Sequence, residues 1–341
     1  MTQHGWVSQN VESYEIMLAN GTHVTASGTE NPDLYFSVKT GNNNFGIVSH
    51  LNFKTYPIAD KVWGGAVTYS TKYSADFMAA IAEYQLNGQK DTNSALLPYI
   101  AVGNDTILAT FSYLDGIDNP DAFAPFYRIP NTSDTTQVLN SFYELASGSL
   151  PSLPRLRSSF TYAATSLYLD KDAYLGILNI TEQFNSRVQQ ILSGTLVLMV
   201  QPISEAMIEQ SQRKGHNPLD SIVFKPQLCK LLEAYRPQDY FLRLLTNGSL
   251  TGASINIGWS LESDDQFVFE VLEECITTIE SFTKAKKVFD PFIFINDAAP
   301  FQRPLQEYGE NTFQKLRSTS YKYDPAGVFQ SLVPGGFKVL S

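Results

Sequence analysis

The residues with the clearest chemical potential lie between Gly41 and Gly46, in the run Gly-Asn-Asn-Asn-Phe-Gly. Glycine has no Cβ and asparagine tolerates left-handed dihedrals, so such a loop exposes backbone N–H groups to whatever lies above it. N–H groups arranged in this way can hold an anionic or planar ligand. The same composition is also ordinary for a turn that binds nothing. The sequence therefore leaves two interpretations open, a ligand-binding loop and a plain turn.

Other familiar catalytic patterns are missing from the sequence. The four histidines are scattered, with no HExxH motif, and there is no Walker sequence, GxGxxG or GxSxG. The two cysteines, Cys229 and Cys275, match no metal spacing and fit either one disulfide or two buried thiols. We therefore expect no metal site, and phosphoryl transfer and serine hydrolysis lose their usual support.

Composition restricts the possible partners. The 341 residues are enough for two domains, and 43% hydrophobic with 13% aromatic residues exclude general disorder. A net charge of −10 argues against a nucleic-acid partner, because phosphate binding needs a basic face. No long apolar run is present, so we expect no membrane span.

The elements around the loop follow from local patterns. Glu15–Leu18 and His23–Ala26 flank Asn20-Gly21, which predicts a hairpin. The alternating segment 47–56 predicts a strand after the loop. Further along we expect strands at 62–70, 97–102, 106–113, 158–169, 195–201 (ended by Pro202) and 254–259, and helices at 74–85, 136–145, 172–192 and after a capping box at 263–266. Such strand pairs between long amphipathic helices favour an antiparallel sheet with helices on one face, leaving the other face free to cover a cofactor.

Several strings resemble one protein family. Residues 31–36 (NPDLYF) and 44–48 (NFGIV) resemble the end of the FAD-binding domain in the berberine-bridge-enzyme-like flavoprotein oxidases, of the PCMH or vanillyl-alcohol-oxidase type. Residues 5–11 are similar to another family segment. Three departures stand out: Lys39 replaces the usual Arg, Gln9 replaces the usual Asp, and Asn42 and Asn43 replace glycines. Similar matches at 201–204, 215–219, 308–311, 323–330 and 334–338, the last two of fungal type, extend the resemblance over nearly the whole chain.

The resemblance implies an α+β fold: a partial PCMH-type FAD-binding domain plus an antiparallel-sheet substrate domain with helices on one face. Residues 1–60 would be the C-terminal part of the FAD-binding domain, 61–290 the substrate-binding domain, and 291–341 a segment returning to the FAD domain. Residues 221–252 exceed the usual family spacing, which indicates an insertion or a retained intron.

The implied function is that of an FAD-dependent oxidoreductase. The flavin would accept a hydride from an alcohol, sugar or secondary metabolite, with O₂ as acceptor. The resemblance assigns FAD binding to the loop and the start of the next strand, namely Gly41, Asn42, Asn43, Asn44, Phe45, Gly46, Ile47 and Val48. Asp297 falls where many members carry a catalytic Tyr and is a candidate base beside Asn296, although a structural Asp fits equally well. Tyr99, Tyr162, Tyr168 and Gln201 lie on predicted strands and are candidates for the substrate face, with ordinary cross-strand packing as the alternative.

Two alternatives remain. The glycine-rich pyrophosphate loop and the flavin-attaching His of the family are not found, since His4 lies outside that setting, so a truncated, catalytically silent remnant that binds at most a small molecule or partner is the second hypothesis. A carbohydrate-binding module, suggested by the Tyr and Trp content, is the third. Localisation stays open, because no signal peptide pattern accompanies the five sequons, at Asn20, Asn104, Asn131, Asn179 and Asn247.

Overall fold

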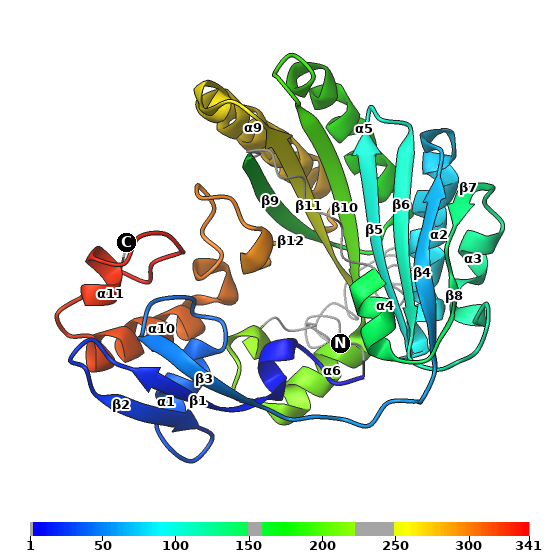
Figure 1. Cartoon of the computed structure of the whole chain (residues 1–341). Helices are drawn as coiled ribbons and strands as arrows, with labels where there is room; N and C mark the ends of the chain where they lie inside the picture. The colour runs from blue at the N-terminus through cyan, green and yellow to red at the C-terminus, as the bar shows by residue number, and fades with distance from the viewer. Residues whose placement is uncertain (1–2, 149–158, 222–248, 341) are drawn as a thin grey trace, which may run out of the picture.

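The computed structural model describes residues 3–148, 159–221 and 249–340. Figure 1 shows a large sheet carrying long helices, and beside it a smaller part that contains the C-terminal segment. The predicted insertion falls mostly at 222–248, outside the described residues, as does Cys229. Residues 250–252 belong to a strand of the large sheet.

The large sheet is antiparallel throughout and has nine strands among the described residues. The order across the sheet is β12 (Phe289–Asp290), β9 (Ser159–Tyr168), β11 (Leu250–Trp259), β10 (Thr195–Ile203), β5 (Ser94–Val102), β6 (Thr106–Tyr113), β4 (Val62–Tyr69) and β7 (Asn131–Asp134), with β8 at Gln137–Leu139.

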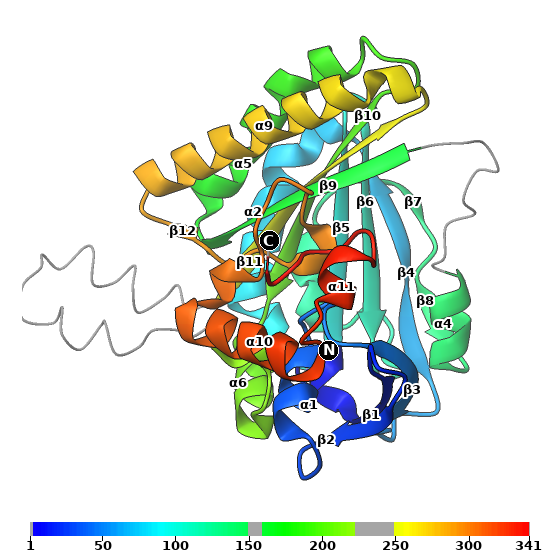
Figure 2. The same cartoon turned by 90° about the vertical axis from the view of Figure 1, so that its left-hand side faces the viewer.

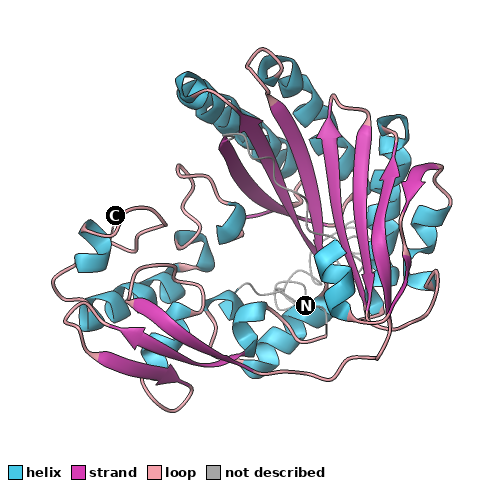
Figure 3. Cartoon of the chain, viewed as in Figure 1, coloured by secondary structure: helices cyan, strands magenta, loops and turns pink. Residues whose placement is uncertain are grey.

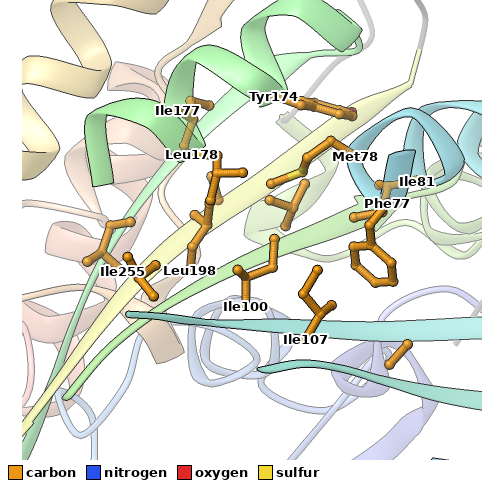
Figure 4. Packing of buried hydrophobic residues seen from close by; sticks show 14 of the residues in the cluster. Phe77, Met78, Ile81, Ile100, Ile107, Tyr174, Ile177, Leu178, Leu198 and Ile255 are labelled. Carbon is orange, nitrogen blue, oxygen red and sulfur yellow. The ribbon is translucent and has the colours of Figure 1, made fainter. Parts of the chain in front are cut away.

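Three long helices cover one face of this sheet: α2 (Ser74–Leu86), α5 (Lys171–Val188) and α9 (Asp265–Ala285) (Figure 3). Because side chains alternate along a strand, every second residue points to this face. Ile100, Leu198 and Ile255 of the strands pack there against Phe77 and Ile177 of the helices (Figure 4). The predicted antiparallel sheet with helices on one face is confirmed.

The smaller part contains a three-stranded sheet in which β1 (Val11–Met17) lies between β2 (His23–Ser27) and β3 (Ile47–Phe53). Helix α1 (Pro32–Val38) lies beside α10 (Glu310–Tyr323), and α11 (Val328–Ser331) follows (Figure 2). A second hydrophobic cluster joins Leu34 and Phe45 to Phe292, Leu316 and Val339. Segments from the two ends of the chain therefore share one core.

The local predictions have mixed outcomes. The hairpin is confirmed, with Met17 opposite His23 and Gly21 in the left-handed region at φ 81°. Residues 136–145 are not one helix, because Gln137–Leu139 pairs with β4 as β8 and α4 (Phe142–Gly148) starts later. Pro202 does not end β10, since the strand continues to Ile203 opposite Leu250. The capping box does not form: a 3-10 turn, Glu262–Asp264, leads into α9 without a side-chain cap.

Candidate functional site

A pocket of about 370 Å³ lies where the segment after α1 meets the C-terminal half of the chain. Aromatic side chains form part of its wall, and Trp6 and Phe294 are stacked with ring centroids 6.0 Å apart. Polar side chains complete it. Its lining consists of Trp6, Val7, Ser8, Val38, Lys39, Thr40, Asn42, Leu219, Phe294, Ile295, Asn296 and Tyr308.

The predicted cofactor loop reaches this pocket only in part. Asn42 lines it, directly after Lys39 and Thr40. Asn44 is fully buried and turned elsewhere: its Nδ2 donates to the carbonyl of Phe337 at 2.7 Å, and its Oδ1 accepts from Val339 N at 3.2 Å. Asn43 likewise donates to the carbonyl of Gly335 at 3.2 Å. The loop's asparagines thus hold the C-terminal segment in place.

The glycines of the loop are required by packing within the protein. A Cβ at Gly41 would strike the Phe45 ring and the Ser37 carbonyl, and a Cβ at Gly46 would lie 2.8 Å from the carbonyl of Met17. Phe45 itself is buried in the second cluster. These three residues are therefore explained by close backbone approach without any ligand.

The other two predicted cofactor residues start strand β3. Ile47 is 60% exposed and Val48 is 37% exposed, and neither lines the pocket.

Lys39 and Gln9, two of the residues that depart from the family pattern, contact each other. Lys39 Nζ donates to Gln9 Oε1 at 3.0 Å, and it lies 4.1 Å from the centre of the Tyr35 ring. Gln9 Nε2 in turn donates to Asp220 Oδ1 at 3.1 Å. The Lys39 side chain is only 8% exposed, and burial lowers its pKa to about 8. Burial also raises the pKa of the Asp220 carboxyl. The Gln9 amide therefore lies between two poorly solvated ionisable groups, Lys39 and Asp220.

A single 3-10 turn, η7 (Ile295–Asp297), joins the pocket to the large sheet. Ile295 and Asn296 line the pocket. The next residue, Asp297, stands over the sheet face opposite the long helices, close to Ser254 of β11. Burial raises the pKa of the Asp297 carboxyl, and the Ser254 hydroxyl opposes part of this rise. Ser254 Oγ makes no hydrogen bond with a described residue, so it acts on the carboxyl from slightly longer range.

All four predicted substrate residues point to this second face of the sheet. The strand register sets Tyr99 in one row with Met199, Ser254 and Ala164, and Tyr162 one row away. Burial raises the pKa of the Tyr99 phenol, and the nearby Tyr162 and Asp297 side chains add to the rise, which places these three groups close together.

The remaining two residues stand apart from that trio. Tyr168 donates to Asp290 at 2.9 Å and packs against the second cluster. Gln201 lies one row from Ser254, opposite Gly252.

The pocket has the character needed for a planar, polar ring system such as a flavin. Thr40 Oγ1 is buried and has no hydrogen-bond partner among residues 3–148, 159–221 and 249–340, so it can serve a ligand in the pocket. Aromatic walls give stacking area, and the amides of Asn42 and Asn296 can donate or accept.

Trp6, Thr40, Phe294, Tyr308 and Ser254 were not predicted as site residues. Trp6 and Tyr308 lie in family-like strings, and Ser254 is a hydroxyl residue between apolar strand neighbours. Thr40 and Phe294 carried no local signal.

The described residues lack two further features. None of their helices has the length and apolar character to cross a membrane. Nor do three or more His, Cys, Asp or Glu side chains gather there in a way that could hold a metal ion. Cys275 is buried, and burial raises the pKa of its thiol to about 12.

No protein-family model matches the chain. It is similar to a bifunctional solanapyrone synthase of Alternaria solani, with 41% identity over 337 residues that cover 99% of the chain and 60% of that protein. It is also similar to an FAD-dependent monooxygenase of Cochliobolus heterostrophus, with 30% identity covering 98% of the chain and 63% of the relative. The chain thus spans about three fifths of the length of these relatives.

Solved structures show the same fold. The 6-hydroxy-D-nicotine oxidase of Arthrobacter nicotinovorans superposes with a TM-score of 0.66 at 14% identity, over 96% of this chain and 66% of that one. A xylooligosaccharide oxidase of Myceliophthora thermophila gives 0.65 at 17% identity, over 96% and 68% of the two chains. The described architecture is therefore that of the corresponding part of vanillyl-alcohol-oxidase-like flavoprotein oxidases.

Proposed function

We propose that this chain contributes the substrate face and part of the cofactor pocket of an FAD-dependent oxidoreductase that removes a hydride from a small organic molecule. The relatives that carry FAD dependence in their names and the flavoprotein fold of the structural neighbours support the proposal. Because the chain spans about three fifths of its relatives, the complete activity is proposed for the whole protein.

The observation that carries the proposal is the double contact of η7. Ile295 and Asn296 line the pocket with its aromatic walls, while Asp297 lies close to Ser254 and Tyr99 of the sheet. An oxidoreductase that transfers a hydride needs its cofactor and its substrate in contact, with a proton acceptor beside them. A turn of three residues that borders both spaces meets this requirement.

FAD, when bound, supplies the hydride acceptor. In our proposal Trp6, Thr40 and Asn296 hold its ring system in the pocket. Asp297 accepts the proton of a substrate hydroxyl, and its raised pKa makes the carboxylate a stronger base than a solvated Asp. Tyr99 and Tyr162 position the substrate on either side.

The first test is retention of flavin by the full-length protein. After incubation with FAD and desalting, we expect the absorption bands of oxidised flavin, and we expect Thr40→Val to weaken retention without lowering the unfolding temperature. Tyr143→Ala, an exposed change on α4, is the matched control. A colourless full-length protein would contradict the proposal and favour the silent remnant.

The second test concerns Asp297. In flavin-loaded protein, Asp297→Asn should slow flavin reduction by an oxidisable substrate about 10²- to 10⁴-fold with unchanged flavin content, because the base is lost. Asp290→Asn, which alters another carboxyl that bonds Tyr168, should change the rate only a few-fold. Equal rates for Asp297→Asn and the unaltered protein would rule out the base.

The electron acceptor is a separate question, since several relatives are named monooxygenases. We propose O₂ as the acceptor, with release of hydrogen peroxide. Incorporation of an oxygen atom from labelled O₂ into the product would instead identify a monooxygenase.

A further inference from the structure

The sheet face that carries Asp297 is covered at its two sides and half-buried in between. On one side η7 contacts β9, Asp297 lies close to Ser254 of β11, and Gln302 Nε2 donates to the Ala164 carbonyl of β9 at 2.6 Å. On the other side α4 packs on β4, so that a Cβ at Gly64 would meet the Leu145 side chain. Strands β10, β5 and β6 lie between these two covers.

The side chains on this middle region are uncharged. Register and alternation place there Val197 and Gln201 of β10, Leu97, Tyr99 and Ala101 of β5, and Thr106, Leu108 and Thr110 of β6. Lys, Arg and His are absent from this set, and Asp297 is the carboxyl at its border. Thus the described part of the face offers hydroxyl, amide and apolar groups together with one negative charge.

There is also room on the Asp297 side of this region. Among the described residues, the heavy atoms nearest to a Cβ at Gly252 would be the Gln201 carbonyl oxygen and the end of the Ile203 side chain, both 4.0 Å away. The neighbouring Leu97, Val197 and Leu108 are half-buried and apolar, so a ligand there gains from removing them from water.

A negatively charged ligand would be disfavoured at this position. Two like charges about 7 Å apart at a partly buried site repel by an amount that corresponds to a loss of roughly 10-fold or more in affinity. The described residues of the face supply no cation to offset this repulsion.

We propose that this face selects a substrate without negative charge: an alcohol whose hydroxyl meets Asp297 near Tyr99 and Tyr162, and whose mainly apolar remainder lies across β10, β5 and β6. The inference rests on the proposed function and adds the substrate class to it. Selection arises because the described residues of the face include no basic side chain and because much of their surface is apolar.

Binding of matched probes to the full-length protein tests this class. The probes are 4-methylbenzyl alcohol, 4-(hydroxymethyl)benzoate and the corresponding trimethylammonium alcohol, with binding followed by saturation-transfer NMR. We expect the neutral alcohol to bind at least about 10-fold more tightly than the carboxylate. Equal or tighter binding of the carboxylate, relative to the neutral alcohol or to the cation, or no binding of the neutral alcohol, would each overturn the proposal.

Placing a cation on the face tests its location. Leu108→Arg should improve binding of the carboxylate probe about 10-fold, whereas Val138→Arg, on the outer strand β8, should leave it unchanged. Thr110→Lys repeats the test should Leu108→Arg fold poorly. No gain for the carboxylate in either folded variant would show that the probe binds elsewhere.

Flavin retention is measured on the same samples. Loss of flavin with intact probe selectivity would defeat the proposed oxidoreductase but leave the neutral-ligand face standing. Retained flavin without probe selectivity would leave the proposed oxidoreductase standing and defeat the proposed substrate class.

Discussion

The Gly41–Gly46 loop and the open face of the large sheet both carry polar groups next to small residues, yet their polar groups have different partners. In the loop, Asn44 bonds the backbone of Phe337 and Val339, and Gly46 lies against Met17. On the sheet, Ser254 Oγ makes no hydrogen bond with a described residue, and Gly252 has space above it.

This difference separates two uses of glycine and polar residues. Where the chain's own backbone approaches closely and fills every donor and acceptor, small and polar residues stabilise the fold. Where the space above the glycine is open and a buried hydroxyl is left without a close partner, the protein has capacity for a ligand. These contacts are the reason for proposing the sheet face and the pocket edge at Thr40 and Asn42, rather than the remainder of the loop, as the main ligand contacts.

The largest expected effect on stability comes from Gly46 of the loop, and Gly252 of the sheet is its contrast. Gly46→Ala should lower the free energy of unfolding by about 4 kcal/mol or more, because its Cβ would overlap the Ile16 side chain and the Met17 backbone. Gly252→Ala, within a strand and with open space, should change it by about 1 kcal/mol or less. Urea denaturation measures both. A small effect of Gly46→Ala combined with lost flavin would return the ligand-binding role to the loop.

Asn44 gives a second, somewhat smaller contrast. Asn44→Ala leaves the Phe337 carbonyl and the Val339 N–H without their buried partner, and we expect a loss of about 3 kcal/mol. Asn42→Gly is the control: φ at this residue is 58°, which glycine adopts freely, so its stability should be nearly unchanged. A neutral Asn44→Ala would mean that the C-terminal segment is held by other contacts.

Lys39 tests how the pocket edge responds to pH. Its pKa falls from 10.5 to about 8 in the folded protein, so between these values the unfolded chain binds more protons than the folded one. The contribution of Lys39 to stability therefore rises with pH across this window, by up to ~3 kcal/mol. The difference in unfolding free energy between the unaltered protein and Lys39→Met should grow by this amount from pH 8 to pH 10.5.

Gln9→Glu is the matched variant for this test. A carboxylate next to Lys39 should raise the lysine pKa and flatten the pH dependence. A constant difference between the unaltered protein and Lys39→Met over the whole window would show that Lys39 is well solvated.

Much of the fold could be predicted because its signals are local. The Asn20-Gly21 turn, the alternating strands β5 and β6 and the apolar stripe of α9 each depend on neighbouring residues. The failures also have physical reasons. A short strand such as β8 is stabilised by pairing with β4, and the start of α9 is set by the preceding 3-10 turn, so neither appears in local propensity.

The candidate site depended more on distant contacts. The sequence predicted Tyr99, Tyr162, Tyr168 and Gln201 to lie on strands, and in the structure the strand register points all four to one sheet face. Their proposed contact with a substrate stays a prediction. The partners of Asn44 lie 293 and 295 residues away, and no local pattern reports them. The assignment of cofactor, base and substrate roles remains a prediction for all these residues.

The smallest and most specific effect is expected at Ser254. Ser254→Ala removes one buried hydroxyl that makes no hydrogen bond with a described residue, so stability should change by less than about 1 kcal/mol. The hydroxyl now opposes the rise in the pKa of Asp297, and its removal should raise that pKa further. Since the base acts when ionised, the acid limb of the pH profile of flavin reduction should move to higher pH, while the rate at high pH stays the same.

Thr165→Ala, on the helix-covered face of β9, is the control and should leave the profile in place. A shifted profile with unaltered stability would show that Ser254 acts through Asp297, and an unmoved profile would mean that another group is the base.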